Sequence, residues 1–136
     1  MQRLYSLVYN ARVMIVVGPD SFFRSMTPDE FGFPVVARSA RAPGVRVPED
    51  VELDDEEMVV PGTGGMSVAP TSMWNLPNHR RPRGLKRGST GPTGDCVFSL
   101  ESLALGKFLL TARPDPDQPA RHAFIEPGIR VPLGSY

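Results

Sequence analysis

The sequence predicts an α+β fold, with a compact mixed or antiparallel β core of about six or seven short strands and one or two short helices. Its 15 prolines and 13 glycines among 136 residues divide the chain into short pieces and disfavour long helices. Apolar residues recur in short alternating or β-branched runs, and the long crossover helices that a parallel sheet needs are missing. The length suits one modest core, so residues 1–136 are predicted to form a single domain.

The first quarter of the chain carries two strand signals and one helix signal. Residues 4–9 alternate as a half-buried strand does, and residues 13–17 form an apolar, β-branched run. Residues 21–26 are ambiguous between strand and helix. The run Thr27-Pro28-Asp29-Glu30 predicts a short helix that ends at Gly32, because threonine caps helix starts and acids favour the positive end of the helix dipole.

The middle of the chain contains four segments of contrasting composition. Residues 35–48 mix arginines with small residues and prolines, which predicts an extended loop, and the acidic block 49–57 predicts solvated surface. A glycine-rich turn at 62–65 leads into a short strand that presents Ser67 opposite its apolar neighbours. The basic stretch 79–87 could hold a diphosphate or a nucleic-acid backbone, pair with the acidic block, or simply be solvated.

The last third of the chain predicts three strands, one short helix and an edge strand. The strands are expected at 96–100, 108–112 and 122–127, and the helix from Ser99 to Gly106. In the last strand, strict alternation would place His122, Phe124 and Glu126 on one face. Residues 129–133 contain a proline and suit a sheet edge.

Composition narrows the classes of function. Fifteen basic side chains balance fifteen acidic ones, so no global field favours nucleic acid or a membrane surface. The single cysteine, Cys96, rules out an internal disulfide, fits a reducing compartment and is expected to be a small buried side chain. Two histidines, His79 and His122, offer no familiar metal-ligand spacing, so no metal is expected. No apolar run approaches the roughly 20 residues that span a bilayer, and no cleavable leader is seen, so export would take a non-cleaved route.

Three segments resemble the type VI secretion exported effector toxins, bacterial proteins with an ADP-ribosyltransferase-like fold. They are Leu4-Tyr5, Gly64-Gly65-Met66-Ser67-Val68 and His122-Ala123-Phe124-Ile125-Glu126-Pro127. The resemblance implies that NAD binds as co-substrate in a cleft between two small sheets. The chain departs from the family pattern at Ser6, where the toxins have arginine, and at Met66, where they have threonine.

The resemblance also assigns roles to individual residues. It implies catalysis by Ser67, His122 and Glu126, with the carboxylate stabilising an oxocarbenium-like transition state. The candidates for binding NAD are Tyr5, Gly64, Gly65, Ser67 and Arg80, the last because it belongs to the basic stretch that could hold a diphosphate. Ordinary alternatives stand beside these roles: Tyr5 as core, Ser67 as a turn residue, His122 as a partly buried histidine and Glu126 as an exposed strand end.

Three functions follow as hypotheses. The first is an effector toxin that acts in the target-cell cytoplasm by transferring ADP-ribose from NAD to a macromolecule, or by cleaving NAD. The second is a non-catalytic binding module of the same fold, and the third is a nucleic-acid-acting toxin that uses residues 79–87. The resemblance implies a cognate immunity protein as partner, a cytoplasmic location in producer and target cells, and no membrane association.

Overall fold

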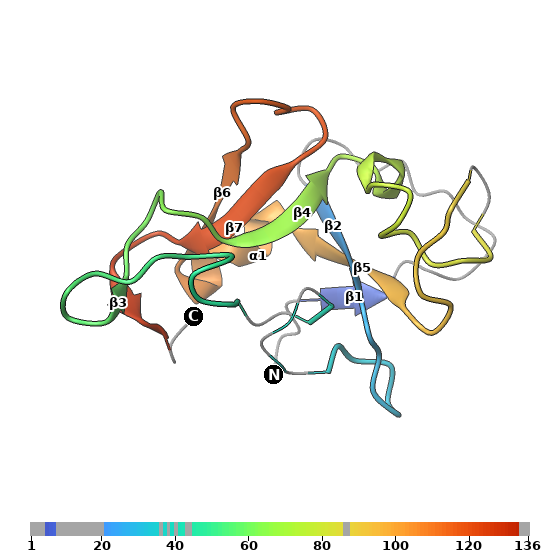
Figure 1. Ribbon diagram of the computed structural model, residues 1–136, viewed down its shortest axis with the longest axis horizontal. Helices are drawn as coiled ribbons and strands as arrows, with labels where there is room; N and C mark the ends of the chain where they lie inside the picture. The colour runs from blue at the N-terminus through green and yellow to red at the C-terminus, as the bar shows by residue number, and fades with distance from the viewer. Residues whose placement is uncertain are drawn as a thin grey trace.

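The computed structural model describes residues 5–7, 21–35, 37, 39, 41–42, 45–85 and 88–133, with the backbone alone at 5–7. The architecture is α+β and mostly antiparallel, as predicted (Figure 1). The strands are β1 Tyr5–Leu7, β2 Ser21–Met26, β3 Met58–Val59, β4 Met66–Pro70, β5 Cys96–Glu101, β6 Leu110–Pro114, β7 Ala123–Pro127 and β8 Val131–Pro132. The helices are α1 Ser102–Leu105 and the short 3₁₀ turns η1 Met73–Asn75 and η2 Gly106–Phe108. Six strands form one sheet in the order β1-β5-β2-β4-β7-β6, and β3 and β8 form a separate ribbon.

Strand β2 lies inside the sheet and is buried over its whole length. It pairs with β5 from Ser21↔Glu101 to Met26↔Cys96. Phe22 belongs to one apolar cluster and Phe23 to another, because neighbouring strand residues point to opposite faces of the sheet. A strand covered on both faces shows no alternation of polar and apolar residues, which explains why residues 21–26 were ambiguous.

The sheet divides between β2 and β4. Only two residue pairs, Phe22↔Pro70 and Phe23↔Ala69, join these strands, although β2 continues to Met26. Beyond them, the Arg24 guanidinium replaces the backbone ladder by donating to the Ser67 carbonyl at 2.6 Å. The result is two three-stranded halves, β1-β5-β2 and β4-β7-β6, and Figure 1 shows β4 and β7 running across the direction of β2.

The predicted helix at Thr27 is wrong, because local side-chain hydrogen bonds favour turns there. The Asp29 carboxylate accepts from the backbone N–H groups of Phe31 and Phe33, at 2.8 and 2.9 Å. The Thr27 hydroxyl donates to Asp95 at 3.2 Å instead of capping a helix.

Most other predicted elements are confirmed within the described residues. The strands expected at 96–100 and 122–127 are β5 and β7, and α1 with η2 occupies the predicted helical region. The strand expected at 108–112 is β6, which begins two residues later because Phe108 belongs to η2. The strand expected at 4–9 is seen as β1, and the one expected at 13–17 lies outside the described residues.

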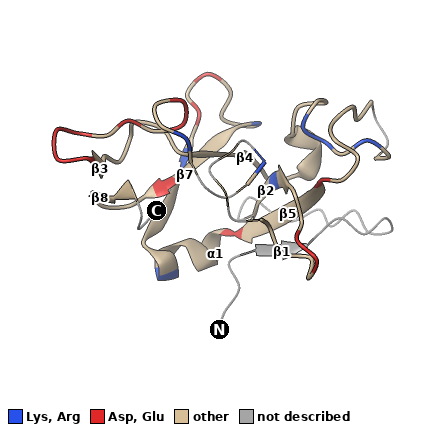
Figure 2. Cartoon of the chain, turned by 60° about the horizontal axis from the view of Figure 1, so that its bottom comes forward, with Lys and Arg blue, Asp and Glu red and all other residues tan. Residues whose placement is uncertain are grey.

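The acidic block is mostly solvated, as predicted, and lies on the outer loop beside β3 (Figure 2). Three of its members have arginine partners: Asp50 pairs with Arg46, and both Asp54 and Glu56 pair with Arg130. Neither partner comes from the basic stretch 79–87. Among the described residues no helix is long and apolar enough to cross a membrane.

Candidate functional site

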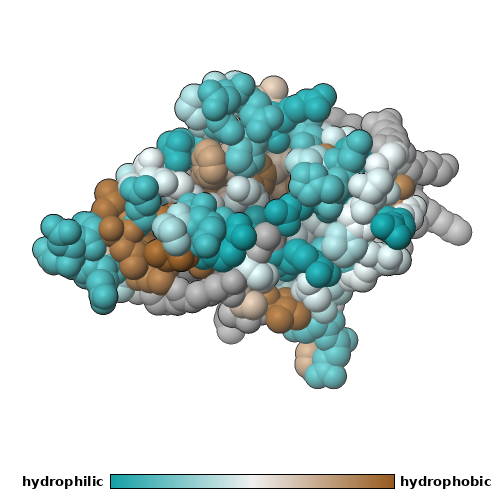
Figure 3. Space-filling model, in the orientation of Figure 1, coloured by the Kyte–Doolittle hydropathy of each residue, from teal (hydrophilic) through white to brown (hydrophobic). Residues whose placement is uncertain are grey.

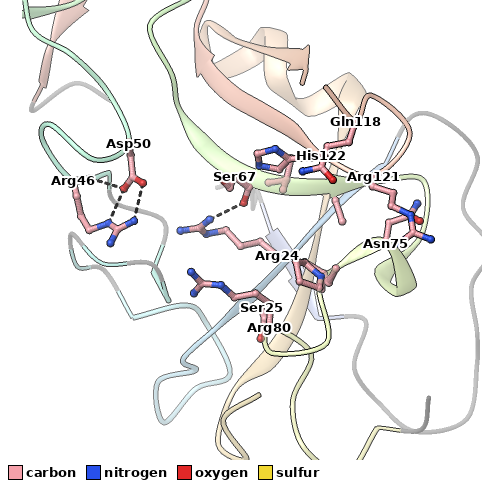
Figure 4. A pocket seen from close by; sticks show the side chains of 14 residues that line it. Arg24, Ser25, Arg46, Asp50, Ser67, Asn75, Arg80, Gln118, Arg121 and His122 are labelled. Atoms are coloured by element: carbon pink, nitrogen blue, oxygen red, sulfur yellow. Dashed lines mark hydrogen bonds and ion pairs between the residues drawn. The ribbon is translucent and has the colours of Figure 1, made fainter. Parts of the chain in front are cut away.

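A cleft of about 430 Å³ opens where β2 and β4 diverge, a size typical of ligand-binding pockets. It is lined by β2, β4, the segment from η1 to Arg80, the loop before β3 and the loop that joins β6 to β7 (Figure 4). Its titratable lining residues are Arg24, Arg46, Asp50, Arg80, Arg121 and His122. Neutral polar groups come from Ser25, Ser67, Asn75 and Gln118.

The cleft is cationic although the whole chain is neutral. Four arginines face a single carboxylate, that of Asp50, among the residues that line it. In the orientation of Figure 3, apolar surface gathers near β3 and β8, whereas the face over β2 and β4 is mostly hydrophilic. A concave site lined by one sign of charge attracts ligands of the opposite sign, so the geometry favours an anionic ligand.

Arg24 bridges the gap between β2 and β4 and lines the cleft. Its side chain is buried, and its guanidinium donates to the carbonyls of Ala42 at 3.0 and 3.2 Å and of Ser67 at 2.6 Å. These bonds tie β2 to β4 and to the loop at Ala42. The positive charge of Arg24 also helps to lower the pKa of Asp50, another residue of the cleft.

Arg46 and Asp50 form a two-pronged ion pair on another wall. The Arg46 Nε lies 3.0 Å from Asp50 Oδ2, and Nη2 lies 2.9 Å from Oδ1. Burial raises the pKa of Asp50, but hydrogen bonds from Arg46 and the charge of Arg24 outweigh it, so that the pKa is lowered on balance. Asp50 is therefore ionised at neutral pH.

Ser25 lines the cleft, and its hydroxyl is buried. The residue is 4% exposed, and its Oγ has no hydrogen-bond partner among the described residues. Buried hydroxyls are nearly always paired, because an unpaired one loses its hydration without compensation. A group of this kind in a cationic cleft is suited to bind a ligand oxygen.

His122 is held at the edge of the cleft by its neighbours. Its Nδ1 lies 2.7 Å from Asp115 Oδ2, and its ring meets the Phe124 ring edge-on at 4.6 Å. The hydrogen bond from His122 lowers the pKa of Asp115. Because Nδ1 is engaged, Nε2 is the ring nitrogen that can meet a ligand.

Three of the residues predicted from the sequence come together in the cleft: Ser67, Arg80 and His122. They lie on separate elements of the chain. Ser67 is exposed in β4 between the buried Met66 and Val68, as the alternation predicted.

Glu126 lies outside the cleft. It shares a face of β7 with Phe124, as predicted, because the Arg113 guanidinium both covers the Phe124 ring and pairs with Glu126. Its carboxylate is buried, accepting from Arg113 at 3.1 Å and from the Gly62 N–H at 2.8 Å. Glu126 lies four positions after His122 along an extended chain, which is about 13 Å. The Glu126 carboxylate is thus bound to Arg113 and to the Gly62 N–H, within the protein and away from the cleft.

The two predicted glycines and Tyr5 are not among the lining residues. Gly64 is required for a different reason: a Cβ atom there would lie 2.0 Å from the Asp50 carbonyl oxygen. The neighbouring Gly65 is buried. The side chain of Tyr5 is outside the described residues, and β1 is separated from β4 by β5 and β2.

The basic stretch 79–87 does not act as one surface. Arg80 lines the cleft, whereas Arg81 is buried and donates to the carbonyls of Trp74 and Leu76, at 3.2 and 3.0 Å. The Arg81 guanidinium also lies over the Trp74 ring, 5.5 Å from its centroid.

Sequence reasoning missed Arg24, Arg46 and Arg121 as cleft residues. A signal for Arg24 was present, since one arginine among Phe22, Phe23 and Met26 is unusual for a buried strand. Arg46 and Arg121 lie in loops, and nothing in their local sequence places them beside β4.

Comparisons with protein-family models, curated proteins and solved structures found no match for the chain. Among the described residues, no group of histidine, cysteine and acidic side chains could hold a metal ion. Function is therefore inferred from the cleft.

Proposed function

We propose that this chain is an effector-toxin domain that binds NAD in the arginine-lined cleft and uses it in an ADP-ribosyltransferase-like reaction. One observation carries the proposal: the cleft lies between the two halves of the sheet and collects four arginines with Ser67 and His122. A cleft between two small sheets is where the resemblance to the exported toxins expects NAD. The target-cell cytoplasm is the proposed site of action, and a cognate immunity protein is the proposed partner.

The lining residues suit a dinucleotide chemically. Guanidinium groups bind phosphate oxygens through paired N–H donors, so Arg24, Arg46 and Arg80 provide charge for the diphosphate. Ribose hydroxyls and a carboxamide need neutral donors and acceptors, which Ser67 and Gln118 offer.

The reaction would break the bond between ribose C1′ and the nicotinamide nitrogen, with the electron pair leaving on nicotinamide. An acceptor nucleophile or water would form the new bond to C1′ and lose its proton. His122 is placed to take that proton at Nε2, and Asp115 would orient the ring and stabilise its charged form. Ser67 would orient the ribose. Glu126 receives no reacting role, because its carboxylate is bonded to Arg113 and Gly62.

NAD consumption by the purified protein tests this proposal. His122→Ala should lower kcat/KM by about a hundredfold to ten-thousandfold, the usual contribution of a proton-transfer group, and Ser67→Ala should lower it as well. His79→Ala is the matched control, since His79 is exposed and does not line the cleft. Absence of NAD consumption, or an equal loss in His79→Ala, would contradict the proposal.

The binding module without catalysis is the second candidate, and the position of Glu126 favours it. Among the described residues, Asp50 is the single carboxylate on the cleft, and Arg46 holds it. Growth after cytoplasmic expression separates the two candidates. A toxic wild type with harmless Ser67→Ala and His122→Ala variants, all equally abundant, supports the enzyme, whereas a harmless wild type that binds NAD supports the module.

The nucleic-acid-acting toxin has less support, because Arg81 is turned into the protein. It predicts RNA or DNA binding that weakens steeply with salt. Salt-insensitive or absent binding removes it.

A further inference from the structure

Asp50 is an anion already built into a cleft that favours anions. Both of its carboxylate oxygens face the Arg46 fork, and its side chain is 15% exposed against 40% for Arg46. This paired geometry is the one in which arginine also binds phosphate. The Asp50 oxygens therefore lie where the oxygens of a ligand phosphate would bind Arg46.

The backbone holds Asp50 in this position. Its N–H donates to the Arg46 carbonyl at 2.9 Å, and its own carbonyl lies against Gly64 so closely that no Cβ fits between them. The carboxylate also accepts from the Arg46 backbone N–H at 2.8 Å. A ligand phosphate that displaces Asp50 must therefore compete for the guanidinium and replace or release this backbone bond.

Other cationic groups in the cleft attract a ligand that carries more negative charge than Asp50. In Figure 4 the guanidinium ends of Arg24 and Arg80 point toward the side of the cleft that holds Arg46 and Asp50. A singly charged anion that displaces Asp50 replaces one negative charge beside Arg46 with another and gains no net attraction. A ligand with two or more phosphate charges gains additional attraction.

We infer that Asp50 is a built-in competitor that sets the charge selectivity of the cleft, and that Ser25 donates a hydrogen bond to the phosphate-bearing ligand that displaces it. The inference rests on the proposed function in one respect, which is that a phosphate-bearing ligand enters this cleft. It adds two residues that the resemblance does not assign. Ser25 belongs to it because the residue lines the same cleft and its buried Oγ lacks a partner in the described part of the chain.

Isothermal titration calorimetry with inorganic pyrophosphate and with ADP tests the inference. Asp50→Asn should bind both about tenfold more tightly than the wild type, since one competing negative charge is lost from a partly exposed site. The affinity of Asp50→Asn for orthophosphate should rise by at least the same factor. The preference for pyrophosphate over orthophosphate should therefore be smaller in Asp50→Asn than in the wild type. Asp54→Asn is the matched control: it makes the same charge change in an arginine pair that does not line the cleft. Equal affinity of Asp50→Asn and Asp54→Asn would overturn the role of Asp50.

Ser25→Ala tests the second residue and should not disturb folding. Removing a hydroxyl that has no partner should leave the melting temperature unchanged or raise it, while ADP affinity falls about fivefold. Ser99→Ala is the control, because Ser99 is a buried serine of β5 that does not line the cleft. Unchanged ADP affinity in Ser25→Ala, or no pyrophosphate binding by any variant, would overturn the inference.

The inference and the proposed function fail separately. Tighter ADP binding by Asp50→Asn with no NAD consumption by the wild type retains this inference and overturns the enzyme. If the wild type consumes NAD and neither Asp50→Asn nor Ser25→Ala changes the affinity for pyrophosphate, the enzyme is retained and this inference is overturned.

Discussion

Replacing Gly64 with alanine should destabilise the protein more than replacing Gly62, which lies in the same turn before β4. Gly64 has φ +145°, and a Cβ atom there would meet the Asp50 carbonyl oxygen at 2.0 Å and its carbon at 3.1 Å. Gly62 is the control, since its φ is +89° and a Cβ would meet nothing within 4 Å. Both substitutions strain the backbone, but only Gly64→Ala also forces two backbone segments apart.

The expected magnitudes follow from these two terms. A left-handed backbone costs an alanine about 1–2 kcal/mol, which is the whole effect expected for Gly62→Ala. Overpacking adds about 1–3 kcal/mol, so Gly64→Ala should lose about 2–5 kcal/mol of unfolding free energy. The clash is with main chain, which cannot rotate away as a flexible side chain can.

Urea unfolding followed by circular dichroism measures both variants against the wild type. The midpoint for Gly64→Ala should fall well below that for Gly62→Ala, with similar slopes. Equal midpoints would refute the close approach of the Gly64 and Asp50 backbones. They would also remove the basis for a fixed Asp50 backbone in the cleft.

Three further predictions concern the fold outside the cleft. The hydrogen bond from Arg130 lowers the pKa of Asp54 from 3.8 to about 2. The pair therefore stabilises the protein above pH 3.8 and loses this effect as the pH falls toward 2. The melting temperatures of the wild type and Asp54→Asn should converge as the pH is lowered through this range. Phe23→Ala should cost about 3–5 kcal/mol in urea unfolding because the ring is buried, whereas the exposed Phe31→Ala should cost little. Glu126→Gln should cost about 1–3 kcal/mol because its buried carboxylate accepts two hydrogen bonds, yet it should consume NAD at the wild-type rate per folded molecule.

Elements with a one-sided apolar pattern could be predicted from the sequence. The strand β7 alternates, with Ala123 and Ile125 in the core and Phe124 on the other face, and its bounds were found within one residue. The strand β4 likewise presents Ser67 between buried neighbours. In both cases the local period of the chain determines which side chains are buried.

Features that depend on distant parts of the chain were not predictable. Thr27 resembles a helix cap until Asp95, far away in the sequence, takes its hydroxyl as a donor. The cleft exists because β2 and β4 separate after two residue pairs, a divergence that Arg24 fills with bonds to Ala42 and Ser67. No local sequence pattern indicates such a separation of two strands. The sequence therefore pointed to individual residues of the cleft, but not to the other residues that line it.

Backbone amide chemical-shift mapping with NAD tests the central claim most directly, since it asks where the ligand binds independently of turnover. Saturable shifts should gather at Ser67, Arg80, Arg121 and His122, four residues that are distant in sequence and meet in the cleft. Their amides should titrate with one common dissociation constant. Shifts confined to other surfaces, such as the exposed Arg83, or no shifts at all, would contradict the assignment of the function to this cleft.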